Sequence, residues 1–186
     1  MSHIVNLLTD EGMPQAATGL QRVKISESET PVYPFAASGE LISLHYLDDE
    51  ELGYVPCGGK GCVLCAIGLH RTEHVLLPVY NPSTGAVEVL LASTSQRPGS
   101  LLPPLKAILK AGRPVVVFLT RNGKKFTVSS GAIPADADHG ESAIAAFNTA
   151  YAAKEFKLES VFPVYDADLL KELPSVKSKR KIKGLE

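Results

Sequence analysis

Residues 57 to 65 read Cys57-Gly58-Gly59-Lys60-Gly61-Cys62-Val63-Leu64-Cys65, and they include all three cysteines of the chain. The glycines between the cysteines let the backbone turn back on itself, so that three thiolates can converge on one metal ion. Zinc takes four ligands in a tetrahedron, and three cysteines with one histidine are a standard set. The stretch therefore predicts a structural zinc loop, around which the rest of the chain is organised.

A redox-active Cys-x₂-Cys of the thioredoxin kind is the alternative interpretation of Cys62 and Cys65. Such a motif needs a strand before it and a long helix after it, within a βαβ unit. Pro56 and the glycines of the loop fit that arrangement poorly. The sequence therefore favours zinc over redox chemistry.

The fourth ligand has to be a histidine, and three are near enough to be considered. His70 follows Cys65 by five residues, His74 heads a predicted strand, and His45 lies in the strand before the loop. On spacing alone His70 ranks first, because nearby ligands lose less chain entropy when they are gathered. A lone histidine is more often a surface or core residue than a ligand, so two of the three are expected to have no metal role.

Length and composition indicate one intracellular domain with mobile ends. The chain has 186 residues, 45% of them hydrophobic, and a formal net charge of −1, so no global basic field attracts nucleic acid. Three clustered cysteines indicate a reducing compartment, and we find neither a signal peptide nor a membrane span. We expect a flexible segment at 1–19, one domain at 20–173 and a flexible basic tail at 174–186.

Hydrophobic alternation and turn chemistry predict a mainly β protein with two or three helices. The expected strands are 41–47, 52–55, 74–80, 86–92, 114–120 and 125–129, with a weaker one at 20–25. The expected helices are 101–109, 142–157 and 167–173, with one helical turn at 66–69. Ser100 is a candidate N-cap, and Asn122-Gly123 is the clearest hairpin turn. Hairpin, helix, hairpin is the order found in an OB-fold, so we expect a small OB-like barrel with an inserted zinc loop.

The order of these motifs carries a resemblance to a known family. Leu44-His45-Tyr46 is followed by Tyr54-Val55-Pro56-Cys57 and then by Cys62-Val63-Leu64-Cys65. This order resembles the T-even phage single-stranded DNA-binding (helix-destabilising) proteins, in which an upstream histidine and three cysteines hold zinc inside an OB-fold. The resemblance implies a structural Zn²⁺ held by His45, Cys57, Cys62 and Cys65.

The resemblance also implies a function. We expect a sequence-independent single-stranded DNA-binding protein that acts in replication, recombination or repair of a phage or mobile element, in the cytoplasm of a bacterial host. Whether RNA is also bound is left open, and replication proteins are expected partners. We expect no enzyme activity, because no Ser/His/Asp set or P-loop is present and a closed set of four ligands leaves zinc no open position.

Single-strand binding needs a positive groove and aromatic platforms for the bases. The residues that we expect to supply them are Tyr46, Arg71, Tyr80, Arg113, Arg121, Lys124, Lys125 and Phe126. Arg97, Lys106 and Lys110 are further basic candidates. The alternative is that the lysines are ordinary surface residues and that the aromatics belong to the core.

A second function stays open at this point. The alternative, ranked second, is a non-catalytic, zinc-stabilised subunit or adaptor of a larger nucleoprotein complex. Its near-neutral charge, its 6% aromatic content and its lack of tryptophan favour that alternative.

Overall fold

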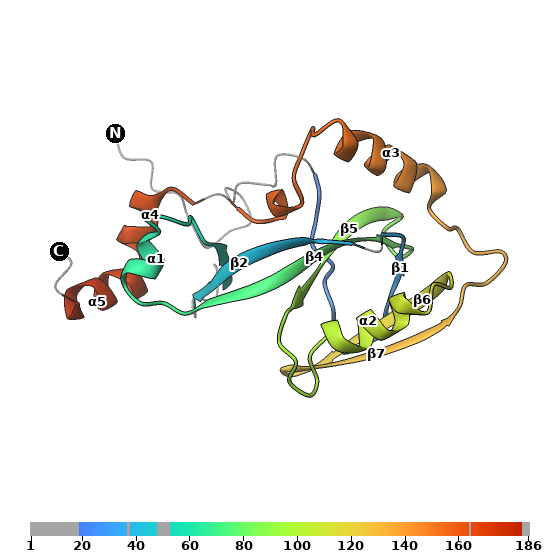
Figure 1. Ribbon diagram of the computed structural model, residues 1–186, viewed down its shortest axis with the longest axis horizontal. Helices are drawn as coiled ribbons and strands as arrows, with labels where there is room; N and C mark the ends of the chain where they lie inside the picture. The colour runs from blue at the N-terminus through green and yellow to red at the C-terminus, as the bar shows by residue number, and fades with distance from the viewer. Residues whose placement is uncertain (1–18, 37, 48–52, 164, 184–186) are drawn as a thin grey trace. The chain divides into compact units, whose positions relative to one another are not determined.

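The computed structural model describes residues 19–36, 38–47, 53–163 and 165–183. Within them the protein is mainly β, with a seven-stranded sheet and five α-helices (Figure 1). The strands are β1 (Thr30–Pro34), β2 (Glu40–Leu47), β3 (Gly53–Pro56), β4 (Arg71–Asn81), β5 (Ala86–Ser93), β6 (Val115–Asn122) and β7 (Lys125–Ala132). The helices are α1 (Val63–Ala66), α2 (Leu102–Lys110), α3 (Glu141–Ala152), α4 (Ala167–Glu172) and α5 (Pro174–Ile182), with one 3₁₀ turn, η1 (Leu158–Val161).

The chain divides into two compact units. The first unit contains residues 1–19, 43–72 and 162–186, and the second contains 20–42 and 73–161. Strands β2 and β4 contribute residues to both units. The domain boundaries expected at 19 and 173 stay predictions, and the flexible segment expected at 1–18 lies outside the described residues.

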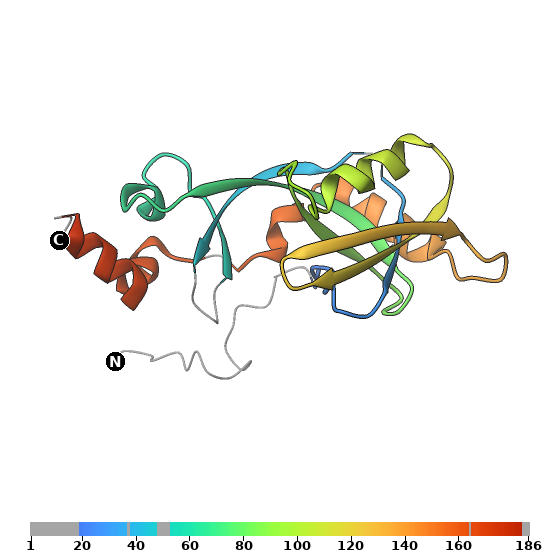
Figure 2. The same cartoon turned by 90° about the horizontal axis from the view of Figure 1, so that it is seen from below.

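The second unit is built on antiparallel hairpins. Strand β4 pairs with β5 from His74 opposite Ser93 to Asn81 opposite Ala86. Strand β6 pairs with β7, and the short strand β1 pairs with β6 through its first residues and with β4 through its last ones. Helix α2 covers this unit's core through Leu102 and Leu105 (Figure 2). The core residues are Val32, Leu77, Val79, Leu90, Ala92, Leu101, Leu102, Leu105, Val117 and Leu119.

Turn chemistry predicted the hairpins, with one shift of register. Asn122 pairs with Lys125, so the β6–β7 loop is Gly123-Lys124 rather than Asn122-Gly123. Gly123 has a φ of 59°, and Lys124 is not among the described non-glycine residues with positive φ. This combination matches a two-residue turn with glycine first, one of the two geometries that follow the twist of a hairpin.

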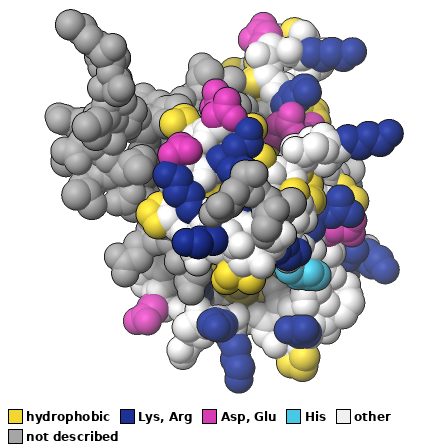
Figure 3. Space-filling model, turned by 90° about the vertical axis from the view of Figure 1, so that its left-hand side faces the viewer, with side chains coloured by type: hydrophobic (Ala, Val, Ile, Leu, Met, Phe, Trp, Pro, Cys, Tyr) yellow, Lys and Arg dark blue, Asp and Glu magenta, His cyan; other side chains and the backbone are white. Residues whose placement is uncertain are grey.

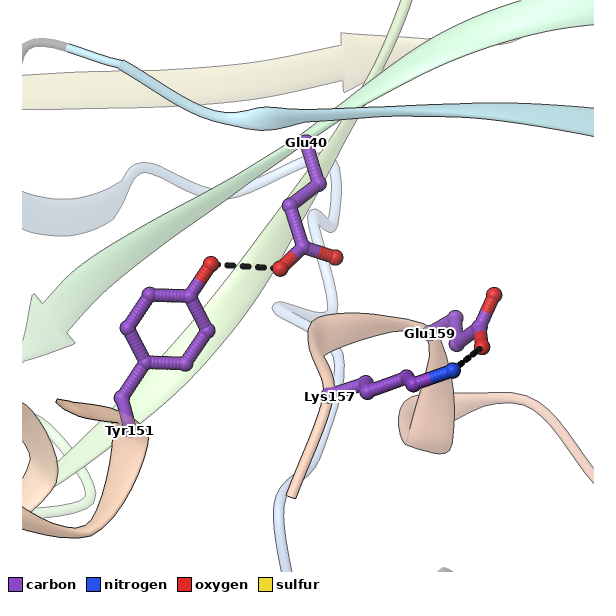
Figure 4. Close-up of polar contacts among 4 residues, drawn as sticks. All are labelled: Glu40, Tyr151, Lys157 and Glu159. Carbon is purple, nitrogen blue, oxygen red and sulfur yellow. Dashed lines mark hydrogen bonds and ion pairs between the residues drawn. The ribbon is translucent and has the colours of Figure 1, made fainter. Parts of the chain in front are cut away.

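Helix α3 packs through a cluster of aromatic rings. The Phe147 ring lies 5.8 Å from Phe35, 5.7 Å from Tyr151 and 5.3 Å from Phe156, measured between ring centroids. The Tyr151 hydroxyl donates a hydrogen bond to Glu40 (Figure 4). The helix ends at Ala152, before the predicted end at residue 157, and Lys154 adopts a left-handed φ of 58°.

The first unit consists of the β2–β3 hairpin, α1, the start of β4, and the C-terminal helices. Its core contains Leu47, Val55, Cys62, Leu64, Ile67, Leu170 and Val176. The segment 174–182, expected to be a flexible tail, is helical, and Val176 within it is fully buried. The expectation fails here because that one valine, with Leu173 beside it, anchors an otherwise polar helix.

Three other expectations differ from the structure. Residues 20–25 form only an isolated bridge of Arg22 with Val89, and β1 was not predicted. Ser100 does not cap α2, whose N-cap position is Leu101 without a side-chain hydrogen bond.

No described helix is long and apolar enough to cross a membrane.

Candidate metal centre

Four side chains of the first unit converge on one point. They are His45 from β2, Cys57 just after β3, Cys62 just before α1, and Cys65 within α1. Their ligand atoms all lie within 4.8 Å of one another. His45 is fully buried and Cys65 is exposed, so the cluster lies where the core of this unit meets its surface.

Local backbone structure explains the convergence. The Cys57 N–H donates to the Ser43 carbonyl at 2.9 Å, which extends the pairing of β3 with β2 up to the first cysteine. Gly59 and Gly61 have φ of 69° and 84°, a region that favours glycine, and they turn the chain toward Cys62. Helix α1 then places Cys65 one turn after Cys62, on the same side.

The distances between the ligand atoms match a tetrahedral metal site. The Cys57 and Cys65 sulfurs are 3.6 Å apart. His45 Nε2 lies 3.5 Å from Cys62 Sγ and 3.4 Å from Cys65 Sγ. Zinc bonds of about 2.3 Å to sulfur and about 2.0 Å to nitrogen give tetrahedron edges of about 3.8 Å between sulfurs and about 3.5 Å between sulfur and nitrogen. These three separations therefore match the edges of a zinc tetrahedron, and all four ligand atoms lie within 4.8 Å of one another.

The other ring nitrogen of His45 has its own partner. Nδ1 lies 3.2 Å from the His70 carbonyl oxygen, and only the protonated nitrogen can donate to a carbonyl. The lone pair is then on Nε2, which faces the sulfurs. Burial lowers the pKa of His45 and so keeps the ring neutral. Histidines that bind a metal usually donate their other ring N–H to a carbonyl or carboxylate, which fixes the orientation of the ring.

The structure brings His45, and neither His70 nor His74, into the cluster. His70 contributes its main-chain carbonyl and has an exposed side chain. His74 is a buried residue of β4 in the second unit. Ranking by spacing alone would have chosen His70, because that criterion ignores that β2 pairs with β3 and carries His45 alongside the loop.

The thiols have unequal proton affinities. Burial raises the pKa of Cys62, but backbone N–H groups of Cys65, Gly58 and Leu64 lower it overall. The pKa of Cys65 is raised to about 11, mainly by its hydrogen bond with the Cys57 thiol and to a smaller extent by burial and by the Cys62 thiol. Three thiolates this close repel one another, so the cluster needs a cation to hold all of them deprotonated.

The residues expected to bind nucleic acid lie in both units. Tyr46 and Arg71, in the first unit, are exposed, and the Tyr46 ring lies edge-on to Tyr54 at 5.2 Å. Arg113, Arg121, Lys124 and Lys125 are exposed in the second unit. Phe126 is half-buried against the core of that unit. Basic residues are therefore accessible, whereas Phe126 is mainly a packing residue.

Tyr80 is a correction to the expected set. Its side chain is 1% exposed, and its hydroxyl donates to Asp138 Oδ2 at 2.7 Å. That hydrogen bond raises the pKa of Tyr80. The ring occupies the space that a side chain at Gly140 would fill. Tyr80 therefore anchors the loop before α3 and presents no face to a base.

The basic residues of the second unit were named as candidates from the sequence, but the absence of acidic residues from the stretch that contains them was not noted. Between Glu88 and Asp136 the sequence contains seven Lys or Arg residues and no Asp or Glu. All seven are exposed, and none forms an ion pair with a carboxylate of the described residues. Phe118 was also overlooked. It alternates with buried Val117 and Leu119, so its half-exposed ring lies on the face of β6 away from the core.

Four of the basic residues form a group that we call the hairpin cluster: Arg97, Arg121, Lys124 and Lys125. The Phe126 N–H donates to the Gly99 carbonyl at 2.8 Å, which ties the loop carrying Arg97 to the hairpin. Gly99 also packs directly against the Lys125 side chain. The main-chain N–H of Arg121 donates to the main-chain carbonyl of Ser26 at 2.7 Å. The acidic residues Glu27 and Glu29, which follow Ser26 in the sequence, therefore adjoin one edge of the cluster.

Comparisons with models of protein families, with curated proteins and with solved structures found no match to this chain.

Proposed function

We propose that His45, Cys57, Cys62 and Cys65 bind one structural Zn²⁺. The single observation that carries this proposal is the agreement of the S–S and S–N separations with the edges of a zinc tetrahedron. Soft sulfur donors with one imidazole favour zinc over harder cations such as magnesium or calcium. Four protein ligands leave no open position, so the metal would supply folding energy rather than catalysis.

Elemental analysis of the purified chain tests this site, with about one zinc per chain as the expected result. His45→Ala should lower the zinc content, whereas the matched variant His70→Ala should leave it unchanged, since only the His70 carbonyl contacts the site. A chain without zinc, or equal losses in both variants, would overturn the proposed ligand set.

We further propose that the protein binds single-stranded DNA without sequence specificity, through the hairpin cluster. The stretch from Val89 to Ala135, which contains no Asp or Glu, supports this proposal. Its exposed Lys and Arg side chains form no ion pair with a carboxylate of the described residues, so they are available to bind phosphate groups. Phe118, on β6 of the same unit, offers a partly exposed ring for stacking. The resemblance to the phage helix-destabilising proteins points to the same ligand.

The same proposal includes an OB-like architecture. In support, α2 lies between the β4–β5 and β6–β7 hairpins in the sequence, which is the order expected for that fold. Strand β1 also pairs with both β4 and β6, as a strand at the corner of a bent sheet does.

Two double variants with the same charge change separate a specific surface from general electrostatics. Lys124→Gln with Lys125→Gln removes two cations of the hairpin cluster. Lys154→Gln with Lys157→Gln removes two cations elsewhere, one of which is compensated by Glu159 at 3.4 Å (Figure 4). Binding to a labelled dT oligonucleotide is measured by fluorescence anisotropy over a range of salt concentrations.

The hairpin variant should bind more weakly and lose about 0.7 per phosphate contact from the slope of log K against log salt, while the control stays close to the parent. Equal losses in both variants would place the binding surface elsewhere. A parent that binds no oligonucleotide at low salt would overturn the DNA proposal and leave the zinc-stabilised adaptor in its place.

A further inference from the structure

The C-terminal helices pack on the metal loop itself. Leu170 from α4 and Val176 from α5 are buried in one cluster with Leu64 and Ile67. Leu64 directly precedes the ligand Cys65, and Ile67 follows it by two residues. The turn that places Cys62 and Cys65 around a metal therefore also builds the apolar surface on which these helices rest.

A second contact ties the end of α5 to the same loop. The Lys183 ammonium lies over Gly68, where a side chain would otherwise be. The Gly68 N–H donates to the Cys65 carbonyl at 2.9 Å, and the Leu69 N–H donates to the Leu64 carbonyl at 2.9 Å. Residues 64–69 thus connect the ligand Cys65 directly to the surface under α5.

Helix α5 has little stability of its own. It has nine residues, whereas isolated helices shorter than about 12 residues are marginal in water. Lys177 and Lys181 are four residues apart, a spacing at which like charges destabilise a helix. Figure 3, a view from the end at which Figure 1 draws α4 and α5, shows Lys and Arg side chains spread over that face with Asp and Glu side chains among them. The helix is therefore held by its docking, and Val176 is its fully buried contact.

We propose that metal binding controls the docking of the C-terminal segment 167–183, so that loss of the metal releases basic helix α5 from the loop. This inference rests on the proposed metal site. Linkage makes the coupling reciprocal: the factor by which the metal favours the docked state equals the factor by which docking tightens metal binding.

Trypsin cleavage of the full-length protein reports the docked state, because α5 contains Lys177, Lys179, Arg180 and Lys181. In the zinc-loaded protein these bonds should be cleaved slowly, and a zinc chelator should raise the rate about tenfold or more as the helix opens. Cleavage after Lys124, in the β6–β7 turn of the second unit, is the internal reference and should not change.

Val176→Ser tests the coupling from the other side. With zinc bound, it should raise the cleavage rate in α5 about 10- to 100-fold, since a buried valine loses its apolar contacts. It should weaken zinc binding, measured by competition with a chromophoric chelator, by a similar factor. Ser178→Ala, at an exposed position of the same helix, is the control and should change neither quantity. Leu170→Ala repeats the test from α4 if Val176→Ser is poorly expressed.

The outcomes separate the two proposals. A chain that binds no zinc overturns the metal site and the coupling together. A chain that binds zinc but shows the same cleavage of α5 before and after chelation overturns the coupling alone. Faster cleavage in Val176→Ser with unchanged zinc affinity also overturns the coupling, because linkage then fails.

Discussion

Removing the metal should unfold the first unit while the second unit stays folded. The two units have apolar cores of different size. Among the described residues, the buried cluster of the first unit contains seven residues, one of which is the proposed ligand Cys62, whereas that of the second unit contains ten. A small core leaves little net stability once the loss of conformational entropy is counted, so we expect the first unit to depend on the proposed metal.

The size of the effect follows from mass action. Structural zinc sites bind with about 10–16 kcal/mol at neutral pH, which corresponds to dissociation constants from about 50 nM down to the picomolar range. At about 10 µM free zinc, the native state then gains about 3–9 kcal/mol. Whole domains are stable by only about 5–15 kcal/mol. Chelation should therefore remove most or all of the stability of the first unit.

Hydrogen exchange followed by mass spectrometry resolves the two units in one experiment. After chelation, amides at 53–72 and 165–183 should exchange at least about 100-fold faster, as the lost free energy requires. Amides of β6 and β7 should keep their protection. His45→Ala should reproduce the pattern without chelator, and His70→Ala should not. Unchanged protection at 53–72 in protein shown to be zinc-free would refute the reasoning.

Four further predictions concern single residues. Gly140→Ala should destabilise the second unit by more than about 1 kcal/mol in urea denaturation, because Gly140 has a φ of 66° and Tyr80 fills the side-chain space. Tyr80→Phe should cost about 1 kcal/mol without weakening DNA binding. Hydrogen bonds from the Gly140 N–H and the Tyr80 hydroxyl lower the pKa of Asp138 in the folded state. The stability that the Asp138 carboxylate contributes is therefore present above pH 3.8, the usual pKa of the group, and is lost as the pH falls through its lower pKa in the folded protein. Asp138→Asn should remove this dependence of stability on acid pH. Cys65, although exposed, should react with a thiol reagent only after chelation, and equal labelling before and after would contradict a metal-bound thiolate.

Local signals in the sequence predicted most of the sheet and part of the site. The two hairpins flanking α2 were visible because each has an alternating strand on both sides of strong turn residues. The cysteine loop was visible because its ligands are close in sequence. Strand β1 was missed because its five residues, Thr-Pro-Val-Tyr-Pro, include two prolines, and its pairing with β4 and β6 depends on residues more than 40 positions away.

Long-range packing accounts for the other errors. Tyr80 looked like an exposed ring, but residues 76–81 of β4 are all buried, so alternation does not distinguish an outer face there. Helix α5 looked like a flexible tail, because its only deeply buried residue, Val176, packs against a loop more than 100 positions earlier. Neither burial leaves a periodic signal in the local sequence.

The two proposed functions draw on different parts of the chain, and this difference makes them separable. The proposed zinc ligands and α5 all belong to the first unit, whereas the hairpin cluster belongs to the second. Arg121 and Lys125 lie on strands paired along their whole length, in a unit with a larger apolar core. The hairpin cluster should therefore keep its geometry without metal. Any DNA affinity that chelation removes must then come from the first unit, where Tyr46, Arg71 and α5 are the groups able to supply it.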